Sequence, residues 1–392
     1  MLSEKTKSIV QSTVPVLIQH GTAITSCFYK NLFTDHPELL NLFNQSNQKQ
    51  GRQQEALARA VLAAAANIDN LEVIFPIVKQ VGHKHRSLGV KKEHYPIVGK
   101  YLLEAMKEVL GNQATDEVIT AWGEAYGVIA GVFIGEEEKM YHQAENQCGG
   151  WSGFKSFKLA DKVVESDVIT SFYLTPADHQ SLPDFLPGQY ISVRVKPDGD
   201  AFWHNRQYSL SNAPGTGIFR ISVKKEQPGT VSGFLHNQLN IGDFIEVSAP
   251  AGDFTLIDNG PEPITFLSGG IGVTPFISML NDLAKRNPEW NVQFIHSAQN
   301  EQVHAFKKEV NHLIQSMPNA EAVFFYENTD GRLSFEELQR ILLTKKGNFY
   351  VCGPVPFLKA MLKALSLLDI EKNRIHYEFF GPAVHLNEPQ TV

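Results

Sequence analysis

The hydrophobic pattern of this chain changes its period near residue 150, and that change constrains the fold more than any other feature. From Ser3 to Tyr141 the apolar residues recur at helical spacing, whereas from Phe154 onward they alternate with a period of two. The segment 147–151, which contains Gly149 and Gly150, interrupts both patterns. We therefore expect an all-helical domain followed by a separate, strand-rich part.

A second change near residue 262 divides the strand-rich part. Short strands separated by Pro and Gly turns precede it, which is typical of an antiparallel barrel. Apolar runs such as Ile264–Ser268 and Asn348–Val351 alternate with helices after it, as in a buried parallel sheet. The predicted fold class is therefore multidomain, with an all-α domain at residues 1–147, an antiparallel β-barrel at 151–258 and an α/β parallel-sheet domain at 262–392.

Charge and composition exclude several classes of partner. The net charge of −7 disfavours nucleic acid and stable anchoring to anionic membranes, which both require basic patches. We expect no transmembrane helix, because no uninterrupted apolar run reaches about 18 residues, and the N-terminus lacks the apolar core of a signal peptide. Three cysteines without metal-ligand spacing suit a reducing compartment, most simply the cytoplasm.

Two histidines two residues apart, His83 and His85, lie near the predicted end of a helix. They are about 200° apart around the helix axis, so only one can face a given slot. A lone histidine in a helical domain is more often a surface or core residue than a ligand. His94 is a third candidate for the ligand. Spacing alone does not choose among them.

Other residues of the helical domain make a ligand histidine worth considering. Phe43, Gln53, Leu57 and His85 follow one another at a spacing that resembles a globin. A haem needs an apolar slot, an axial imidazole on one side and a controlled polar group on the other. The adjacent Phe28 and Tyr29 could supply that polar group, although Phe43 and Tyr29 could equally be core residues, with the Tyr29 hydroxyl on a backbone carbonyl.

The last predicted helix carries an acidic run, Glu136–Glu138, that would usually be solvated surface. Tyr126, Phe133, Glu137 and Tyr141 fall on one face of that helix, so Glu137 is in line with packing residues. A carboxylate that bonds a ligand imidazole, directly or through Tyr95, would increase electron donation to iron and favour oxygen activation.

The predicted barrel carries two motifs that resemble the flavin signature of the ferredoxin-reductase family. Pro187-Gly188-Gln189-Tyr190 precedes Arg206-Gln207-Tyr208-Ser209. An arginine suits the FAD pyrophosphate, Tyr208 can stack on the isoalloxazine, and Ser209 can bond it. Gly229-Thr230-Val231-Ser232 then opens a short helix whose N–H groups suit a phosphate. The alternative interpretation of these motif residues is an ordinary pair of strands that carries a surface arginine.

The predicted α/β domain begins with a glycine-rich strand-to-helix turn, where a dinucleotide pyrophosphate can approach the backbone. Its residues are Gly269, Gly270, Ile271, Gly272, Val273, Thr274 and Pro275, and a second loop, Cys352-Gly353-Pro354, follows a later strand. No acidic residue at the end of the second strand can be assigned to a ribose. No basic cluster follows Ile295–Ser297 to bind a 2′-phosphate, which mildly favours NADH over NADPH.

Motifs along essentially the whole chain resemble the flavohaemoglobins of bacteria and yeast. They are Phe28-Tyr29, Glu38-Leu39, Phe43-Asn44, Ser46-Asn47-Gln48, Lys84-His85, Ala121–Gly127 and Tyr377–Pro382. The resemblance implies haem b, FAD and NADH or NADPH as co-substrate. It implies His85 as the proximal iron ligand with Tyr95 and Glu137 as its relay, and Tyr29, Gln53 and Leu57 as the residues that control bound oxygen.

The resemblance also assigns roles outside the haem pocket. Lys84 and Glu378 would be charges that tune electron transfer between haem and flavin. The C-terminal residues Phe379, Phe380, Gly381 and Pro382 would cover the flavin where nicotinamide enters, although such a tail could equally be a strand end packed into the sheet. Phe379 stands where many members of the family have cysteine.

The implied activity is nitric oxide dioxygenation: electrons from NAD(P)H reach haem through FAD, and the oxygen complex converts NO to nitrate. Secondary reduction of O2 or alkylhydroperoxide, a lipid held by Phe28, Phe43, Leu57 and Leu102, and a monomeric state are further expectations. Two rivals remain open: a reductase whose helical domain docks a protein electron acceptor, and a non-enzymatic gas sensor.

Overall fold

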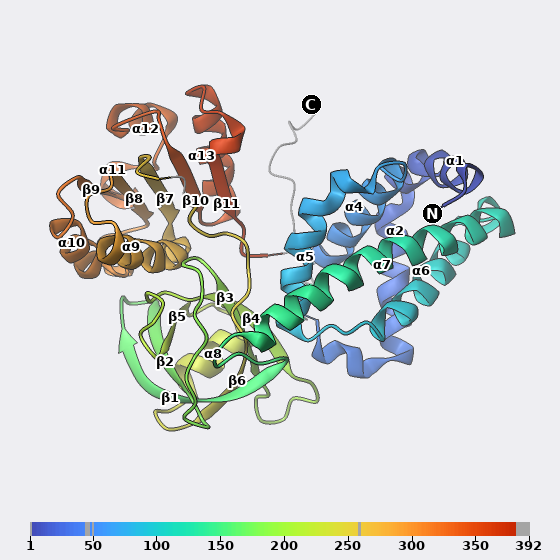
Figure 1. Ribbon diagram of the computed structural model, residues 1–392, viewed down its shortest axis with the longest axis horizontal. Helices are drawn as coiled ribbons and strands as arrows, with labels where there is room; N and C mark the ends of the chain where they lie inside the picture. Colours follow the sequence, from blue (N-terminus) through green and yellow to red (C-terminus); the bar gives the residue numbers. More distant parts are fainter. Residues whose placement is uncertain (1, 44–47, 49–50, 258–259, 382–392) are drawn as a thin grey trace. The chain divides into compact units, whose positions relative to one another are not determined.

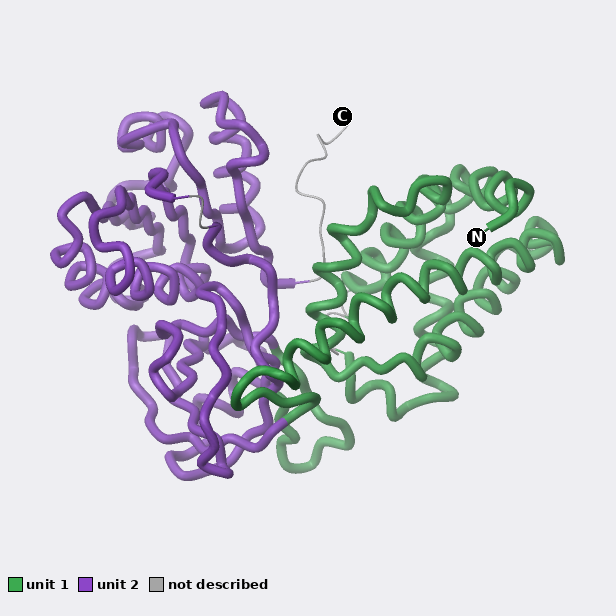
Figure 2. Tube along the Cα trace, in the orientation of Figure 1, with its two compact units in different colours: residues 1–154, 194–206 green, residues 155–193, 207–392 purple. Residues whose placement is uncertain are grey.

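The computed structural model describes residues 2–43, 48, 51–257 and 260–381. Asn44, Ser46, Asn47 and Pro382, which figure in the motifs above, lie outside the described residues. The chain forms two compact units, residues 1–154 with 194–206 and residues 155–193 with 207–392 (Figure 2). Each unit is described by itself.

Unit 1 is built from α-helices joined by short 3₁₀ helices (Figure 1). They are α1 (Glu4–Ser12), α2 (Val14–Asp35), η1 (Pro37–Asn41), α4 (Arg52–Ala66), η2 (Leu71–Ile74), α5 (Phe75–Leu88), α6 (His94–Leu110), η3 (Gly111–Gln113) and α7 (Asp116–Asn146). Ser3 caps α1 by accepting from the Thr6 N–H, and Pro15 marks the expected break, because α1 ends at Ser12 and α2 begins at Val14. The core joins α2, α6 and α7 through Phe28, Leu102, Met106 and Trp122.

Two helices of unit 1 carry residues of the expected iron site. The helix that carries His85 begins at Phe75, after the separate η2, and continues to Leu88, where Gly89 ends it with a φ of +78°. Helix α7 runs five residues beyond Tyr141, to Asn146. By length and composition α7 could cross a membrane, but a core helix passes the same test, and α7 contacts α1, α5 and α6.

The barrel is a six-stranded sheet in the order β4-β3-β6-β1-β2-β5. Its strands are β1 (Phe154–Val164), β2 (Ile169–Pro176), β3 (Tyr190–Val195), β4 (His204–Ser209), β5 (Phe219–Lys224) and β6 (Phe244–Ser248). An antiparallel bridge between Leu210 and Ile221 joins the two end strands, which closes the sheet. The tip of the β3–β4 hairpin belongs to unit 1, where the Trp203 N–H donates to Asn41 Oδ1 at 2.8 Å.

The second sheet of unit 2 is parallel, in the order β11-β10-β7-β8-β9. Its elements are β7 (Ile264–Gly269), η4 (Gly270–Val273), α9 (Thr274–Arg286), β8 (Val292–Ala298), η5 (Glu301–Val303), α10 (Lys307–Gln315), β9 (Ala320–Tyr326), α11 (Glu327–Asp330), α12 (Phe335–Ile341), β10 (Asn348–Cys352), α13 (Val355–Leu367), η6 (Lys372–Arg374) and β11 (Ile375–Glu378). The chain moves outward from β7 to β9 and then returns to β10 on the other side of β7. That reversal places a topological switch point at the carboxyl ends of β7 and β10, which is where open α/β sheets bind ligands.

Side chains alternate along the strands of this sheet, so apolar residues pack against helices on both of its faces. Phe266 on β7 packs with residues of α9 and α10, whereas its neighbour Leu267 packs with residues of α12 and α13 (Figure 1). This is why the strands read as uninterrupted apolar runs in the sequence. The expected fold class is confirmed: a helical domain, an antiparallel sheet and a parallel sheet follow in order.

Candidate functional site

His85 lies at the centre of a buried polar cluster in unit 1. Its Nδ1 is 2.7 Å from Glu137 Oε1 and 3.3 Å from Tyr95 Oη. Tyr95 Oη donates to the same Glu137 oxygen at 2.5 Å, and Glu137 is only 3% exposed. Because a carboxylate can only accept, Nδ1 carries the proton and the lone pair of Nε2 is left for a ligand on the opposite edge of the ring.

Burial, and then the nearby Glu137 charge, raises the pKa of Tyr95. The phenol therefore keeps its proton at physiological pH and acts as a donor to the carboxylate. His85, Tyr95 and Glu137 come from α5, α6 and α7, so three helices must pack before the cluster exists.

Helix α7 also supports this cluster through residues for which the sequence indicated only packing. Tyr126 Oη donates to the Tyr95 carbonyl at 2.7 Å, and Tyr141 Oη donates to the Val90 carbonyl at 2.7 Å. A Cβ on Gly99 would lie 2.5 Å from the Tyr126 ring, so only glycine allows that approach. The pattern of the α7 face was visible in the sequence, but the need for glycine at position 99 was not.

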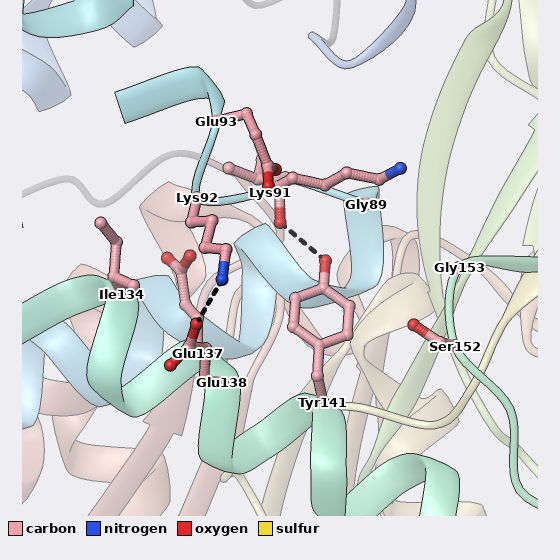
Figure 3. Close-up of a pocket in the computed structure, with 11 residues that line it drawn as sticks. Gly89, Lys91, Lys92, Glu93, Ile134, Glu137, Glu138, Tyr141, Ser152 and Gly153 are labelled. Carbon is pink, nitrogen blue, oxygen red and sulfur yellow. Dashed lines mark hydrogen bonds and ion pairs between the residues drawn. The ribbon is translucent and has the colours of Figure 1, made fainter. Parts of the chain in front are cut away.

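A pocket of about 270 Å³ lies beside the cluster, between the loop 89–93 and α7 (Figure 3). Glu137 and Tyr141 line it, together with Ile134 and the segment 152–153, and Lys92 Nζ lies 3.4 Å from Glu138 Oε1 at its edge. His85 is not among the lining residues, although its partner Glu137 is.

Tyr29 is the buried polar residue of a second cluster in unit 1. Its phenol bonds the side chains of Gln53 and Gln48, and burial raises its pKa. The expected partner Gln53 is therefore in place, whereas Gln48 was not expected to bond Tyr29.

Aromatic and aliphatic side chains surround this second cluster. The Tyr29 ring centroid lies 4.7 Å from that of Phe28 and 5.7 Å from that of Phe43, both in edge contacts. Leu57 follows Gln53 by one turn of α4, and it packs with Leu102 in the same core cluster. One unit thus holds an imidazole with a free Nε2, a phenol donor and apolar walls, which is the donor set that a haem requires.

The two halves of the flavin motif meet in the barrel. The Leu210 N–H, directly after Ser209, donates to the Gln189 carbonyl at 2.9 Å. Gly188 has a φ of +102°, and a Cβ there would lie 2.1 Å from the Phe254 carbonyl oxygen, so the turn before Tyr190 requires glycine. Arg206, Gln207 and Tyr208 lie on β4, which ends at Ser209.

The third flavin segment, Gly229–Ser232, opens a short helix, as the sequence predicts. Helix α8 (Thr230–Asn237) begins directly after Gly229 and contains Val231 and Ser232 in its first turn. Ser232 Oγ accepts from the Glu226 N–H at 3.2 Å, which orders the loop before the helix. Two strand motifs and one helix N-terminus thus form a polar donor set that fits FAD.

Some of the described C-terminal residues pack against the core, whereas others are exposed on the surface. Glu378 ends β11 beside Cys352 of β10, and Phe379 packs against the core under α12 and α13. Phe380 is 44% exposed and Gly381 ends the described chain. Phe380 is therefore the aromatic that remains available to cover a ligand. Lys84, the other residue expected to tune electron transfer, lies on α5 of unit 1.

The two nucleotide loops touch each other at the carboxyl edge of the parallel sheet. The turn 269–275 runs from β7 through η4 into α9, as expected. A Cβ on Gly272 would lie 2.3 Å from the Cys352 carbonyl oxygen, and one on Gly353 would lie 3.1 Å from the Gly269 nitrogen. These glycines let the loops of β7 and β10 pack as one surface for a dinucleotide.

Glu301 lies three residues beyond the end of β8, in η5, and forms an ion pair with Lys307 at 2.6 Å. The Lys307 ammonium also lies over the Tyr326 ring, 5.4 Å from its centroid. Sequence reasoning assigned no acidic residue to this edge, because Glu301 follows the strand only after a turn.

An imidazole site, a flavin motif and a dinucleotide loop in one chain define a haem- and flavin-dependent NAD(P)H oxidoreductase. Family models match the same three regions in the same order. They are the globin model at residues 26–133, the oxidoreductase FAD-binding domain at 156–256 and the oxidoreductase NAD-binding domain at 266–363.

Whole-chain relatives identify the family. A flavohemoprotein of Bacillus cereus is 52% identical over 98% of this chain and 100% of its own, and that of Bacillus subtilis is 50% identical over 98% and 99%. The chain belongs to the flavohemoprotein family.

Solved structures agree with this assignment. The crystal structure of a flavohemoglobin from Malassezia yamatoensis with bound FAD and heme has a TM-score of 0.87 at 28% identity, covering 97% of this chain and 100% of that one. The FAD/NAD-binding domain of a nitric oxide dioxygenase from Vibrio cholerae matches with a TM-score of 0.54 at 38% identity, covering 58% and 99%.

Proposed function

We propose that this flavohaemoprotein is a cytoplasmic, monomeric, NADH-dependent nitric oxide dioxygenase that removes NO. Two molecules of NO, two of O2 and one of NADH give two nitrate ions, NAD+ and a proton, so the reaction balances without another reductant. The observation that carries the proposal is the 2.7 Å contact between His85 Nδ1 and Glu137, in the same chain as a flavin and a nucleotide site. A plain oxygen carrier needs neither the electron supply nor a strongly donating axial ligand.

On the proximal side, His85 holds the iron through Nε2, while Tyr95 and Glu137 keep the Nδ1 proton in a short hydrogen bond. The bond shifts negative charge toward the imidazole and increases its donation to the metal. When bound, haem supplies the iron at which O2 is activated and FAD divides the hydride of NADH into single electrons.

On the distal side, the raised pKa of Tyr29 keeps its phenol protonated as a donor toward bound oxygen, and Gln53 orients it. Phe28, Phe43 and Leu57 form the apolar wall that excludes water. With Leu102 these residues also suit a bound lipid, which we propose as a secondary ligand. Slower reduction of O2 or alkylhydroperoxide follows from the same electron supply.

We assign the flavin pyrophosphate to Arg206, on β4, and to the helix N-terminus at Val231 and Ser232. Tyr190, Gln207, Tyr208 and Ser209 would contact the isoalloxazine, and Phe379, Phe380 and Gly381 would flank it; Pro382, expected beside them, lies outside the described residues. NADH binds the loops 269–275 and 352–354. Lys84 and Glu378 tune the transfer of electrons from flavin to haem.

The carboxylate of Glu301 supports NADH over NADPH as the electron donor. It lies just beyond β8, on the edge where a carboxylate can bond the ribose hydroxyls of a dinucleotide. Its partner Lys307, the nearby cation, is already paired with it. A 2′-phosphate would therefore meet a carboxylate before it met a free ammonium group.

Anaerobic titration of the holoprotein with NADH, followed by NO and O2, tests the proposal. We expect FAD to be reduced before haem, and NO to disappear with an equal amount of nitrate formed. A docking reductase would lack a Soret band after haem supplementation, and His85→Ala would leave its electron transfer intact. A sensor would bind NO without consuming it at the expense of NADH.

A further inference from the structure

Arg220 and Glu309 form a bidentate ion pair in unit 2 that joins the barrel to the nucleotide-binding sheet. Arg220 lies on β5 and Glu309 on α10, and the two Nη–Oε distances are both 2.9 Å. The Arg220 side chain is only 9% exposed. Burial alone would lower the Arg220 pKa, but the Glu309 contact outweighs it and the pKa is raised. The Arg220 guanidinium therefore keeps its charge although it is largely buried.

Polar contacts connect this pair to both binding motifs. Arg220 Nε donates to Ser211 Oγ at 3.2 Å, and Ser211 follows the flavin-motif residue Ser209 by two positions. Glu309 Oε1 also accepts from Asn281 Nδ2 at 2.7 Å, and Asn281 lies on α9, the helix that begins at the glycine-rich nucleotide loop. The pair is thus the midpoint of a chain of contacts from the end of β4 to α9.

Two further contacts link the same elements. Ser278 Oγ on α9 donates to the Asn212 carbonyl at 2.7 Å, and both residues are buried. A Cβ on Gly188 of the flavin motif would lie 2.5 Å from the Met279 side chain, also on α9. The helix that leaves the nucleotide loop therefore bonds the chain three residues beyond Ser209 and lies close to Gly188 of the flavin motif.

The backbone beside Glu309 is held in a strained conformation. Phe306, just before α10, has a φ of +65°, which is rare for a residue with a side chain. Its ring lies beneath the Arg220 guanidinium, 5.2 Å from centroid to Cζ. Such a conformation persists only where the surroundings hold it in place.

We propose that the Arg220–Glu309 pair positions the flavin motif relative to the nucleotide loop, so that the nicotinamide meets the flavin at reaction distance. Neither residue is a catalytic residue; both act through Ser211, Asn281 and α9. In the reaction they serve, a hydride, which is a proton with two electrons, would pass from the dihydronicotinamide to the flavin, leaving NAD+ and the reduced flavin. Transfer requires an approach of about 3–3.5 Å between the reacting atoms, so a small displacement slows it.

The inference rests on the flavin and nucleotide assignments made above. Reduction of wild-type FAD by NADH tests those assignments, and the comparison of variants with wild type tests the positioning role. The two can therefore fail separately.

The experiment compares Arg220→Lys with wild type in the full-length holoprotein. Lysine retains the charge but cannot make the bidentate contact. In single-turnover mixing with NADH we expect the rate of FAD reduction to fall about tenfold, with the dissociation constant for NADH changed less than about twofold. Without NADH, hydrogen–deuterium exchange should become faster at residues 209–213 and 301–309.

Two further variants keep the test decisive. Arg286→Lys is the matched control, because Arg286 makes a bidentate pair with Asp282 on the same α9 but within one helix, and we expect wild-type FAD reduction from it. The double variant Arg220→Met/Glu309→Leu removes both charges, which often leaves stability intact. It should fold and still reduce FAD slowly. Wild-type reduction rates in both folded Arg220 variants, or a loss confined to NADH affinity, would overturn the proposal.

Discussion

The two units each contain a buried histidine cluster, but only one of them is arranged as a ligand site. In unit 1, His85 Nδ1 is 2.7 Å from the buried carboxylate of Glu137. In unit 2, His296 and His304 stack with ring centroids 4.5 Å apart, and their Nδ1 atoms bond hydroxyls, of Ser268 at 2.8 Å and of Tyr326 at 3.0 Å. A tyrosine accompanies the imidazole in both places, so the carboxylate is the difference.

The comparison separates the histidine that we propose as the iron ligand from two core histidines. Burial lowers the pKa of His296 and His304, so both are neutral in the folded protein. The His85 side chain remains 32% exposed and has an anion behind it, so its outer nitrogen is electron-rich and accessible. Within the described ranges no group of three His, Cys, Asp or Glu side chains could hold a bare metal ion.

The largest expected effect comes from His85→Ala, which removes the imidazole on which the comparison of the two clusters depends. Without the axial ligand, NO consumption should fall about a thousandfold, or about 4 kcal/mol in the barrier. Reduction of ferricyanide by NADH should persist, because it needs only unit 2. His304→Gln is the matched control and should keep the Soret band; a normal haem spectrum in His85→Ala would show that another residue binds iron.

The second prediction concerns the pH dependence of folding stability that arises from the neutral histidines His296 and His304 of unit 2. Burial lowers the His304 pKa from 6.5 to about 4, with a further contribution from Lys307. The folded protein therefore binds this proton more weakly than the unfolded chain, and acid favours unfolding. The folding stability that neutral His304 provides is complete above pH 6.5 and is lost as the pH falls toward 4. It amounts to about 3 kcal/mol at most.

Denaturant unfolding of unit 2 between neutral and acidic pH measures this effect. His304→Gln should flatten the profile relative to wild type, because glutamine does not titrate. An unchanged slope in the variant would assign the acid sensitivity to other groups.

Glu137→Gln removes the negative charge but preserves the shape, so that the proximal cluster resembles the neutral one of unit 2. We expect NO turnover to fall about tenfold, as is typical when a partner of a metal ligand is lost. The iron–histidine stretching frequency should fall as well. Tyr95→Phe should have a smaller effect, because the direct His85–Glu137 contact remains; equal losses in the two variants would make Tyr95 an obligatory relay.

The smallest expected effect comes from Tyr326→Phe, the counterpart of Tyr95→Phe. His304 would lose its hydroxyl partner, which should cost about 1 kcal/mol of folding free energy. The vibrational spectrum of the haem should not change, since unit 1 is untouched. A shift in that spectrum would contradict the separation of the two clusters.

Much of the architecture could be predicted from the sequence, because periodicity is a local property. The change from helical to alternating spacing located the two sheets, and the strands 264–269 and 348–352 were recognisable as apolar runs. Strand β1 (Phe154–Val164) was recognised only as the start of the alternating pattern, because its far half is exposed. The face of α7 that carries Glu137 could be read because helical side chains repeat at a known angle.

The sequence by itself determined that one of two neighbouring histidines could serve as a ligand, and that a flavin and a nucleotide motif follow in order. Only the tertiary structure decided which histidine has a carboxylate behind it, because Glu137 is 52 residues away from His85. The same holds for Gln48 beside Tyr29, for Tyr126 against Gly99, and for the pair formed by Arg220 and Glu309 across 89 residues. Such contacts depend on how helices and sheets pack, and local spacing carries no information about that packing.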